Sequence, residues 1–191
     1  GALLATASND KTIKLWQPDG TLVRSLTHSD TILQVAFSAD SQRVITGTLN
    51  GEVLVWSVAG TVLQRLSAHR GPVWGVAESP DGELLVSSSG DRTVKLWRPD
   101  GTPVATMTAP APIWRVNFSP DGQVIAGAVL DGTIKLWSRQ GELLRVLKEH
   151  QAPVWDVAFC PLPAARAPAP QENPAPSTSA SASSAPQQAV V

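Results

Sequence analysis

The sequence repeats itself with a period of about 40 residues, and this regularity constrains the fold more than any other feature. Apolar pentads of the Thr-Ile-Lys-Leu-Trp type end, in steps of 40, 41 and 40 residues, at Trp16, Trp56, Trp97 and Trp137. Segments of the Pro-Val-Trp type place an aliphatic residue at Ile32, Val73, Ile113 and Val154. Turn glycines recur in the same register at Gly20, Gly60, Gly101 and Gly141. Such periods indicate stacked copies of one supersecondary unit.

Each period predicts four short antiparallel strands separated by turns. In one copy, turn residues at Ser79–Gly82, at Gly90-Asp91 and at Pro99–Gly101 separate runs rich in β-branched and apolar residues. The four runs of that copy are Val73–Glu78, Leu84–Ser88, Thr93–Trp97 and Pro103–Met107. Four antiparallel strands repeated at this spacing are typical of a β-propeller blade, so we expect an all-β propeller.

Two details of the repeat refine this expectation. Pro103 cannot donate a hydrogen bond to a neighbouring strand, so the fourth strand is expected at the edge of its sheet. Val73 and Val76 are three residues apart, which interrupts the alternation of a regular strand. The sequence therefore predicts a β-bulge at Trp74-Gly75.

The strand count leaves two arrangements open. Residues 1–27 hold the second, third and fourth strands of a blade, three complete blades follow, and Pro153–Phe159 matches one further first strand. The total is sixteen strands, or about four blades if the last strand pairs with the first three. A small closed ring of that kind would leave no open edge. The alternative is a fragment of a larger ring.

Composition restricts the classes of function. The formal net charge is -1, which predicts no binding of nucleic acid or of an anionic membrane surface. No run of about 18 apolar residues predicts a membrane span. The single cysteine, Cys160, excludes an intrachain disulfide and fits a reducing, cytoplasmic setting.

The composition changes abruptly after the last repeat. From Pro161 onward the chain is rich in Pro, Ala and Ser and lacks apolar periodicity. We therefore expect a propeller domain at 1–160 and a disordered tail at 161–191.

The repeats resemble the WD-repeat family. The resemblance covers residues 1 to about 160 and rests on a His, a Pro-Val-Trp strand, the Phe-Ser-Pro-Asp-Gly turn, an Asp six residues before Trp, and Lys-Leu-Trp. The Trp-Asp dipeptide that names the family is absent, because Gln17, Ser57, Arg98 and Ser138 follow the four tryptophans.

The resemblance implies that each blade is held by a tetrad of His, Ser or Thr, Asp and Trp. One complete set is His69, Ser87, Asp91 and Trp97, and a second, with Asn in place of Asp, is His28, Thr46, Asn50 and Trp56. The third is eroded, since Ala109 and Gly127 accompany Asp131 and Trp137. The fourth is split between the chain ends as His150 with Thr6, Asp10 and Trp16.

The resemblance also implies a partner-binding face at the bulge positions and beside the tetrad Asp. The residues concerned are Leu33, Trp74, Trp114, Trp155, Leu49, Leu130 and Asn9, with Arg115 and Asp156 nearby for polar contacts. Large aromatic residues dominate the energetics of protein interfaces, so this set is a candidate binding surface. The competing interpretation is packing near the central channel.

Other constellations favour structural roles. Ser87, His69 and Asp91 have the composition of a nucleophilic triad, but they recur in several blades, whereas an active site occurs once. His28, His69 and His150 lie about 41 residues apart, a spacing that does not predict a metal site. Glu78 stands where other copies have Phe, and we expect it to reach solvent at its strand end.

The sequence therefore predicts a protein-interaction module without enzymatic activity, metal or cofactor, with a homodimer through blade completion as one form. The alternative is a fragment of a larger WD-repeat sensor or regulatory subunit. A hydrolytic propeller enzyme is the third alternative, and no unrepeated cluster of carboxylates or histidines supports it.

Overall fold

The protein's structure, a computed structural model, describes residues 2–161. Residues up to Cys160 form one compact unit, and the described part of the chain contains strands and turns without a helix. Apart from Pro161, the tail predicted at 161–191 lies outside the described residues.

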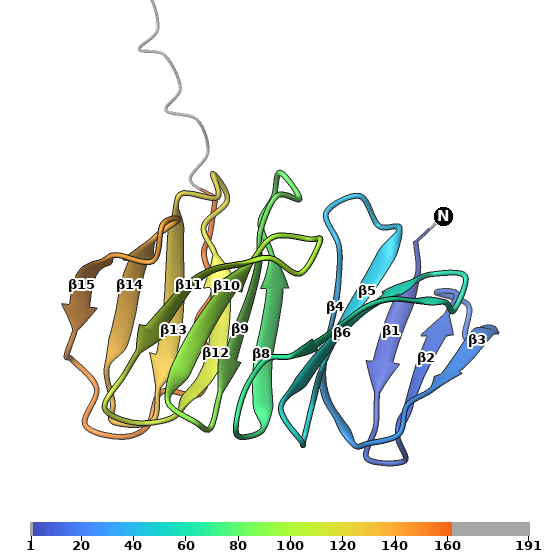
Figure 1. Ribbon diagram of the computed structural model, residues 1–191, viewed down its shortest axis with the longest axis horizontal. Helices are drawn as coiled ribbons and strands as arrows, with labels where there is room; N and C mark the ends of the chain where they lie inside the picture. The colour runs from blue at the N-terminus through green and yellow to red at the C-terminus, as the bar shows by residue number, and fades with distance from the viewer. Residues whose placement is uncertain (1, 162–191) are drawn as a thin grey trace, which may run out of the picture. The chain divides into compact units, whose positions relative to one another are not determined.

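Four antiparallel sheets follow one another in chain order, and we call them blades 1 to 4 (Figure 1). Blade 1 has three strands, β1 (Leu4–Ala7), β2 (Thr12–Trp16) and β3 (Leu22–Thr27). Blade 2 consists of β4 (Ile32–Phe37), β5 (Arg43–Thr48), β6 (Glu52–Ser57) and β7 (Val62–Ser67). Blade 3 consists of β8 (Val73–Glu78), β9 (Leu85–Ser89), β10 (Thr93–Trp97) and β11 (Pro103–Thr108). Blade 4 consists of β12 (Ile113–Phe118), β13 (Val124–Val129), β14 (Ile134–Ser138) and β15 (Leu143–Leu147).

The strand order and the bulges agree with the sequence-based predictions. The strand that begins at Pro103 lies at the edge of its sheet, as its missing N–H requires. The ladder between β8 and β9 shifts register between Val73 and Gly75, so the bulge predicted at Trp74-Gly75 is confirmed. The same shift occurs in β4 and in β12. Each bulge turns one side chain away from the regular alternation.

Of the two arrangements that the strand count left open, the structure does not show a ring closed within one chain. Pro153–Phe159 forms no strand, and among the described residues β1 pairs only with β2. The segment lies instead against blade 4, where the Val154 N–H donates to the Val129 carbonyl at 3.3 Å. Blade 1 and blade 4 lie at opposite ends of the row of sheets, so the packing of successive blades carries the two predicted partners apart (Figure 1).

The hydrophobic core consists of three clusters, and each lies between two successive blades. The blade nearer the N-terminus contributes alternate residues of its third strand, such as Val94 and Leu96, because a strand points every second side chain to one face. The next blade contributes the first residue of its first strand, such as Ile113, and a residue of its second strand, such as Ile125. Burial of these aliphatic side chains stabilises the stack at about 25 cal/mol per Å² removed from water.

The periodic glycines make the contact between blades close at the outer edge. Gly60, Gly101 and Gly141 adopt φ values of 99°, 88° and 90°, a region that residues with a Cβ atom rarely occupy. A Cβ atom on Gly141 would lie 2.6 Å from the Cβ of Ala105 in the preceding blade. Glycine is therefore needed both for the turn and for the approach of the blades.

Candidate functional site

The structure assembles the tetrad of blade 3 as one hydrogen-bonded network. His69 Nε2 lies 2.8 Å from Ser87 Oγ, and His69 Nδ1 lies 3.1 Å from Asp91 Oδ2. The Trp97 indole N–H donates to the same Ser87 oxygen at 3.3 Å. Ser87 and the His69 side chain are buried, so a substrate cannot reach this hydroxyl. The arrangement links the strands of one blade and has the geometry of a structural network.

Asp91 is the centre of that network. Its carboxylate accepts the backbone N–H groups of Thr93 and Arg70 and the Thr93 hydroxyl, at 3.0, 2.9 and 2.6 Å. Burial raises the pKa of Asp91, but these hydrogen bonds outweigh burial and hold it below the ordinary value. Burial lowers the pKa of His69, with the Asp91 charge acting in the opposite direction, which favours a neutral imidazole.

The second predicted tetrad is not assembled. The Trp56 indole N–H donates to Thr46 Oγ1 at 3.2 Å, but the His28 ring bonds to the backbone of Asp30 instead of Thr46. The Asn50 side chain accepts the Thr48 hydroxyl at 2.6 Å. Because Asn carries no charge, it offers the imidazole less attraction than Asp91 offers His69.

The remaining two sets are partial. In blade 4, Asp131 accepts hydrogen bonds from the N–H and hydroxyl groups of Thr133 and from no other described residue. The Trp137 ring lies over Gly127, where a Cβ atom would be 2.7 Å from the ring. In blade 1, Thr6 accepts the Trp16 indole N–H at 2.9 Å and Asp10 accepts the Thr12 N–H at 2.9 Å. His150 lies beside Gly132 of blade 4, so the structure does not bring it to Thr6, Asp10 or Trp16.

Glu78 is buried, contrary to the prediction that it reaches solvent. Its side chain is 1% exposed, and its carboxylate lies 3.1 Å from the Arg43 guanidinium of blade 2. It also accepts the Ala39 N–H at 2.6 Å. Burial raises the pKa of Glu78, with the Ala39 hydrogen bond and the Arg43 charge acting in the opposite direction. The pair fixes the carboxylate inside the boundary between blades 2 and 3.

Three tryptophans of the predicted binding face form a continuous row. The ring centroids of Trp74 and Trp114 are 4.6 Å apart, and those of Trp114 and Trp155 are 5.0 Å apart with the rings perpendicular. These distances lie within the range of favourable aromatic pairs. Trp74 and Trp114 are half-buried, whereas Trp155 is 56% exposed. We call these residues the tryptophan row.

Gly90, which the sequence reasoning did not assign to the site, makes room for one end of this row. A Cβ atom on Gly90 would lie 3.1 Å from the Trp74 ring. The other blades place Asn9, Leu49 and Leu130 at the position of Gly90. A side chain at this position would therefore require the Trp74 ring to shift by a few tenths of an ångström. The copies with Trp114 and Trp155 have Leu130 and Asn9 there, so the glycine alone is no sequence signal for the row.

Beside the row, polar side chains connect β4 of blade 2, β12 of blade 4 and the segment Pro153–Phe159. Arg115 Nη1 donates to Gln34 Oε1 of β4, and Arg115 Nε lies 3.6 Å from Asp156 Oδ1. The sequence reasoning selected Arg115 and Asp156 and missed Gln34. All three follow a bulge position, as Gly75 does in blade 3. Asp156 is largely exposed, so its ion pair with Arg115 contributes little to stability and is open to competition by a ligand.

Two of the other predicted surface residues, Leu49 and Leu130, lie at the same end of the strands as the tryptophan row, and Asn9 lies apart from it. The Leu49 N–H donates to Thr31 and the Leu130 N–H to Pro112, which places both turns beside the start of an inner strand. Leu49 is exposed, whereas Leu33 and Leu130 are half-buried. Asn9 is exposed in blade 1, which has no inner strand among the described residues.

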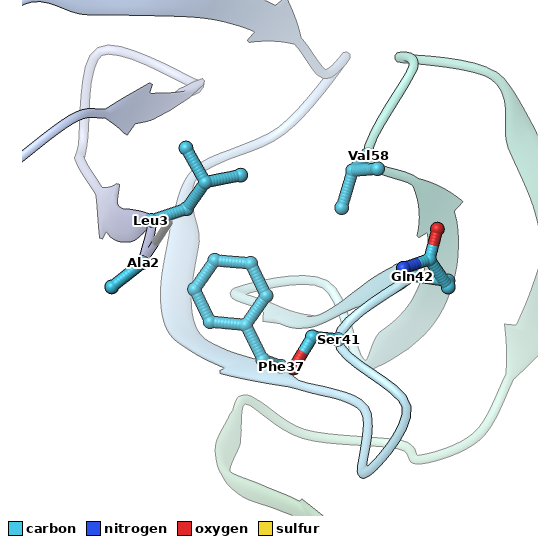
Figure 2. Close-up of a pocket in the computed structure, with 6 residues that line it drawn as sticks. All are labelled: Ala2, Leu3, Phe37, Ser41, Gln42 and Val58. Carbon is cyan, nitrogen blue, oxygen red and sulfur yellow. The ribbon is translucent and has the colours of Figure 1, made fainter.

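A hollow of about 380 Å³ lies at the end of β4 that is farther from the tryptophan row (Figure 2). Phe37, the last residue of β4, faces Leu3 across it, and Val58 and Gln42 complete the wall. The equivalent place between blades 2 and 3 holds Arg43 and Glu78. The hollow contains no charged group and borders Ala2, the first described residue, so it is separate from the tryptophan row.

Two further findings concern the described residues. Residues 2–161 contain no group of three His, Cys, Asp or Glu side chains that could hold a metal ion. Within the same range there is no helix of the length and apolarity needed to cross a membrane.

Comparison with known proteins matches this chain to one family model and to segments of several longer proteins. The family model described as IFT122 first beta-propeller matches residues 1–173. Protein HIR1 of Yarrowia lipolytica is 31% identical over 121 residues, which cover 51% of this chain and 11% of that protein. The human apoptotic protease-activating factor 1 is 36% identical over 104 residues, covering 49% and 8%. A periodic tryptophan protein 2 homolog of Neurospora crassa is 42% identical over 65 residues, covering 33% and 7%. The chain thus spans about a tenth of the length of these relatives.

Proposed function

Because the chain belongs to the family of the IFT122 first beta-propeller, a WD-repeat β-propeller family, we propose that it recognises a protein or peptide at the tryptophan row. The observation that carries the proposal is the contact of Trp74 on β8, Trp114 on β12 and Trp155 in the segment that follows blade 4. Three adjacent indoles, two half-buried and one exposed, provide the apolar centre that protein interfaces require.

The polar chain beside the row supports the same proposal. Arg115 is half-buried and already oriented by Gln34, so little side-chain entropy is lost when it meets a ligand. Its exposed partner Asp156 can be replaced by a carboxylate of the ligand. We therefore propose a peptide with one large apolar side chain for the row and an acidic or carbonyl group for Arg115.

Rigid supports hold the row in place. The bulges at Trp74 and Trp114 are part of the strand ladders, and Gly75 allows β8 and β12 to approach, since a Cβ atom there would lie 3.0 Å from the Val116 nitrogen. A preorganised surface loses less entropy on binding. A role as one part of a larger regulatory subunit is the second candidate, and it is supported by the small share of each relative that the chain matches.

Replacing Trp114 by alanine is expected to weaken peptide binding at least about tenfold, because Trp114 contacts both other indoles and central aromatic residues carry most interface energy. The experiment is selection of a displayed peptide library on the unmodified chain, followed by titration of the enriched peptides. The matched control is Leu63→Ala, which removes an exposed apolar side chain of β7. Peptides that bind Trp114→Ala as tightly as the unmodified chain would contradict the proposal.

A further inference from the structure

Blade 1 and blade 4 each expose an apolar face whose equivalent is buried where two successive blades meet. Between blades, one face is built from alternate residues of the third strand and one residue of the outer strand, which are Leu26, Leu66 and Met107 in blades 1 to 3. These outer-strand residues are 6%, 7% and 4% exposed. Leu147 holds the same position in blade 4 and is 37% exposed. Ile134 and Leu136 of that face are half-buried, whereas their equivalents in blades 1 to 3 are buried.

Blade 1 exposes the complementary face. Val44, Leu85 and Ile125 lie on the second strand of blades 2 to 4 and are at most 2% exposed, because the preceding blade covers them. Leu4 holds this position in blade 1 and is 57% exposed. A Cβ atom on Gly20 would meet nothing within 4 Å, whereas Gly60 at the same turn of blade 2 contacts Leu26. The two exposed faces therefore have the composition of the two sides of one blade boundary.

The segment after blade 4 has the sequence of a first strand, and blade 1 has no first strand among the described residues. This segment, Pro153–Phe159, already lies beside the first strand of blade 4, where the Asn117 side chain donates to the Val157 carbonyl at 2.6 Å. Val154 is 8% exposed, like its buried equivalents Ile113 and Val73. Among residues 2–161 the segment pairs with no second strand, and β1 has one unpaired edge. An unpaired strand edge is open to pairing with another chain, so the segment of one copy can pair with β1 of another.

The incomplete tetrad points to the same junction. The His69 N–H donates to the Gly51 carbonyl of blade 2 while its ring bonds to Ser87 and Asp91 of blade 3. A tetrad histidine therefore belongs to the end of one blade and holds the next blade. His150 lies against the turn at Gly132 of blade 4 in the same way, and its side chain is exposed. In blade 1, Thr6 and Asp10 accept hydrogen bonds from Trp16 and Thr12 and none from a histidine.

We propose that a second copy of this chain occupies these faces: blade 4 and residues 150–159 of each copy dock on blade 1 of the other. Each junction then forms a four-stranded blade from Pro153–Phe159 of one chain and β1, β2 and β3 of its partner. Heterologous contacts of this kind form either closed rings or open fibres. Two copies give eight blades, within the range of about four to eight that propellers commonly have, so a closed pair is the expected assembly.

The first test is the solution mass of the full chain by light scattering after size exclusion. The proposal requires twice the chain mass of 20.1 kDa. His150→Ala is expected to raise the dissociation constant of the pair about tenfold or more, and Glu149→Ala, its exposed neighbour, is the control that leaves the constant unchanged. A monomer, or species larger than a pair, overturns the proposal.

A disulfide test establishes which strands meet. Ala77 pairs with Val86 and Asn117 with Ala126 in the ladders of blades 3 and 4, and the corresponding residues at the junction are Ala158 and Ala5. Oxidation of a chain carrying Ala158→Cys, Ala5→Cys and Cys160→Ser is expected to give a covalent dimer, because paired positions lie within disulfide reach. Ala158→Cys with Ser25→Cys on the outer strand β3 is the control that gives none. A crosslink closed within one chain overturns the proposal.

Discussion

Replacing Arg43 by leucine is expected to lower the free energy of unfolding by about 2–4 kcal/mol at pH 7, which is the range for removing one partner of a largely buried ion pair. Leucine fits the site, because Leu84 and Val124 hold the equivalent positions of blades 3 and 4. The loss arises from Glu78, which keeps a buried carboxylate with only the Ala39 N–H as a partner. Chemical denaturation of the two chains measures the difference.

The pH dependence identifies Glu78 as the cause. Burial already raises the pKa of Glu78, and removal of the Arg43 charge, which lowers it, raises the pKa further. An acid whose pKa is higher in the folded state binds more protons there, so stability is lost as pH rises through that pKa and is regained below the ordinary Glu pKa. The difference between Arg43→Leu and the unmodified chain should therefore shrink as pH falls towards 4. A difference that does not change with pH would contradict this explanation.

The double variant is the matched control. Phe37 and Phe118 hold the position of Glu78 in the neighbouring blades, so R43L with E78F restores the residues of the repeat. Replacing a buried ion pair by apolar residues of similar volume is often neutral or stabilising. We expect the double variant to lie within about 1 kcal/mol of the unmodified chain, and the coupling between the two changes to be large and favourable.

Replacing Asp91 by alanine is expected to cost about 2–4 kcal/mol of unfolding free energy, because it leaves the His69 ring and the N–H groups of Arg70 and Thr93 without their acceptor. Asp131→Ala is the matched control, since Asp131 occupies the same turn in blade 4 and, among the described residues, accepts only from Thr133. Its expected cost is about 1 kcal/mol or less. Equal costs for the two changes would show that the turn, and not the tetrad, determines the stability of a blade.

The sequence predicted the blades well because their information is local and repeated. Alternation in Thr93–Trp97, turn glycines and the interrupted spacing of Val73 and Val76 each act within a few residues, and the structure contains the expected strands and bulge. The row of Trp74, Trp114 and Trp155 also followed from equivalent positions in successive copies.

The predictions that failed depended on contacts between blades. Glu78 was expected at the surface because a buried, unpaired charge is costly. The prediction failed because Arg43, which pairs with Glu78, lies 35 residues away and departs from the repeat in another blade. Ala39 is the third departure, and it supplies an N–H that the equivalent Pro80 and Pro120 lack. Closure of the ring depends on the angle between blades, which strand patterns do not specify.

The measurement that tests the central claim most directly is the indole N–H region of a two-dimensional NMR spectrum, recorded while a selected peptide is added. The chain has seven tryptophans, and Trp16, Trp56 and Trp97 donate their indole N–H groups to Thr6, Thr46 and Ser87. We predict that the resonances of Trp74, Trp114 and Trp155 shift together at a single affinity while those three internal references stay in place. Shifts confined to the reference indoles, or binding that leaves the tryptophan row unshifted, would contradict a recognition surface at that row.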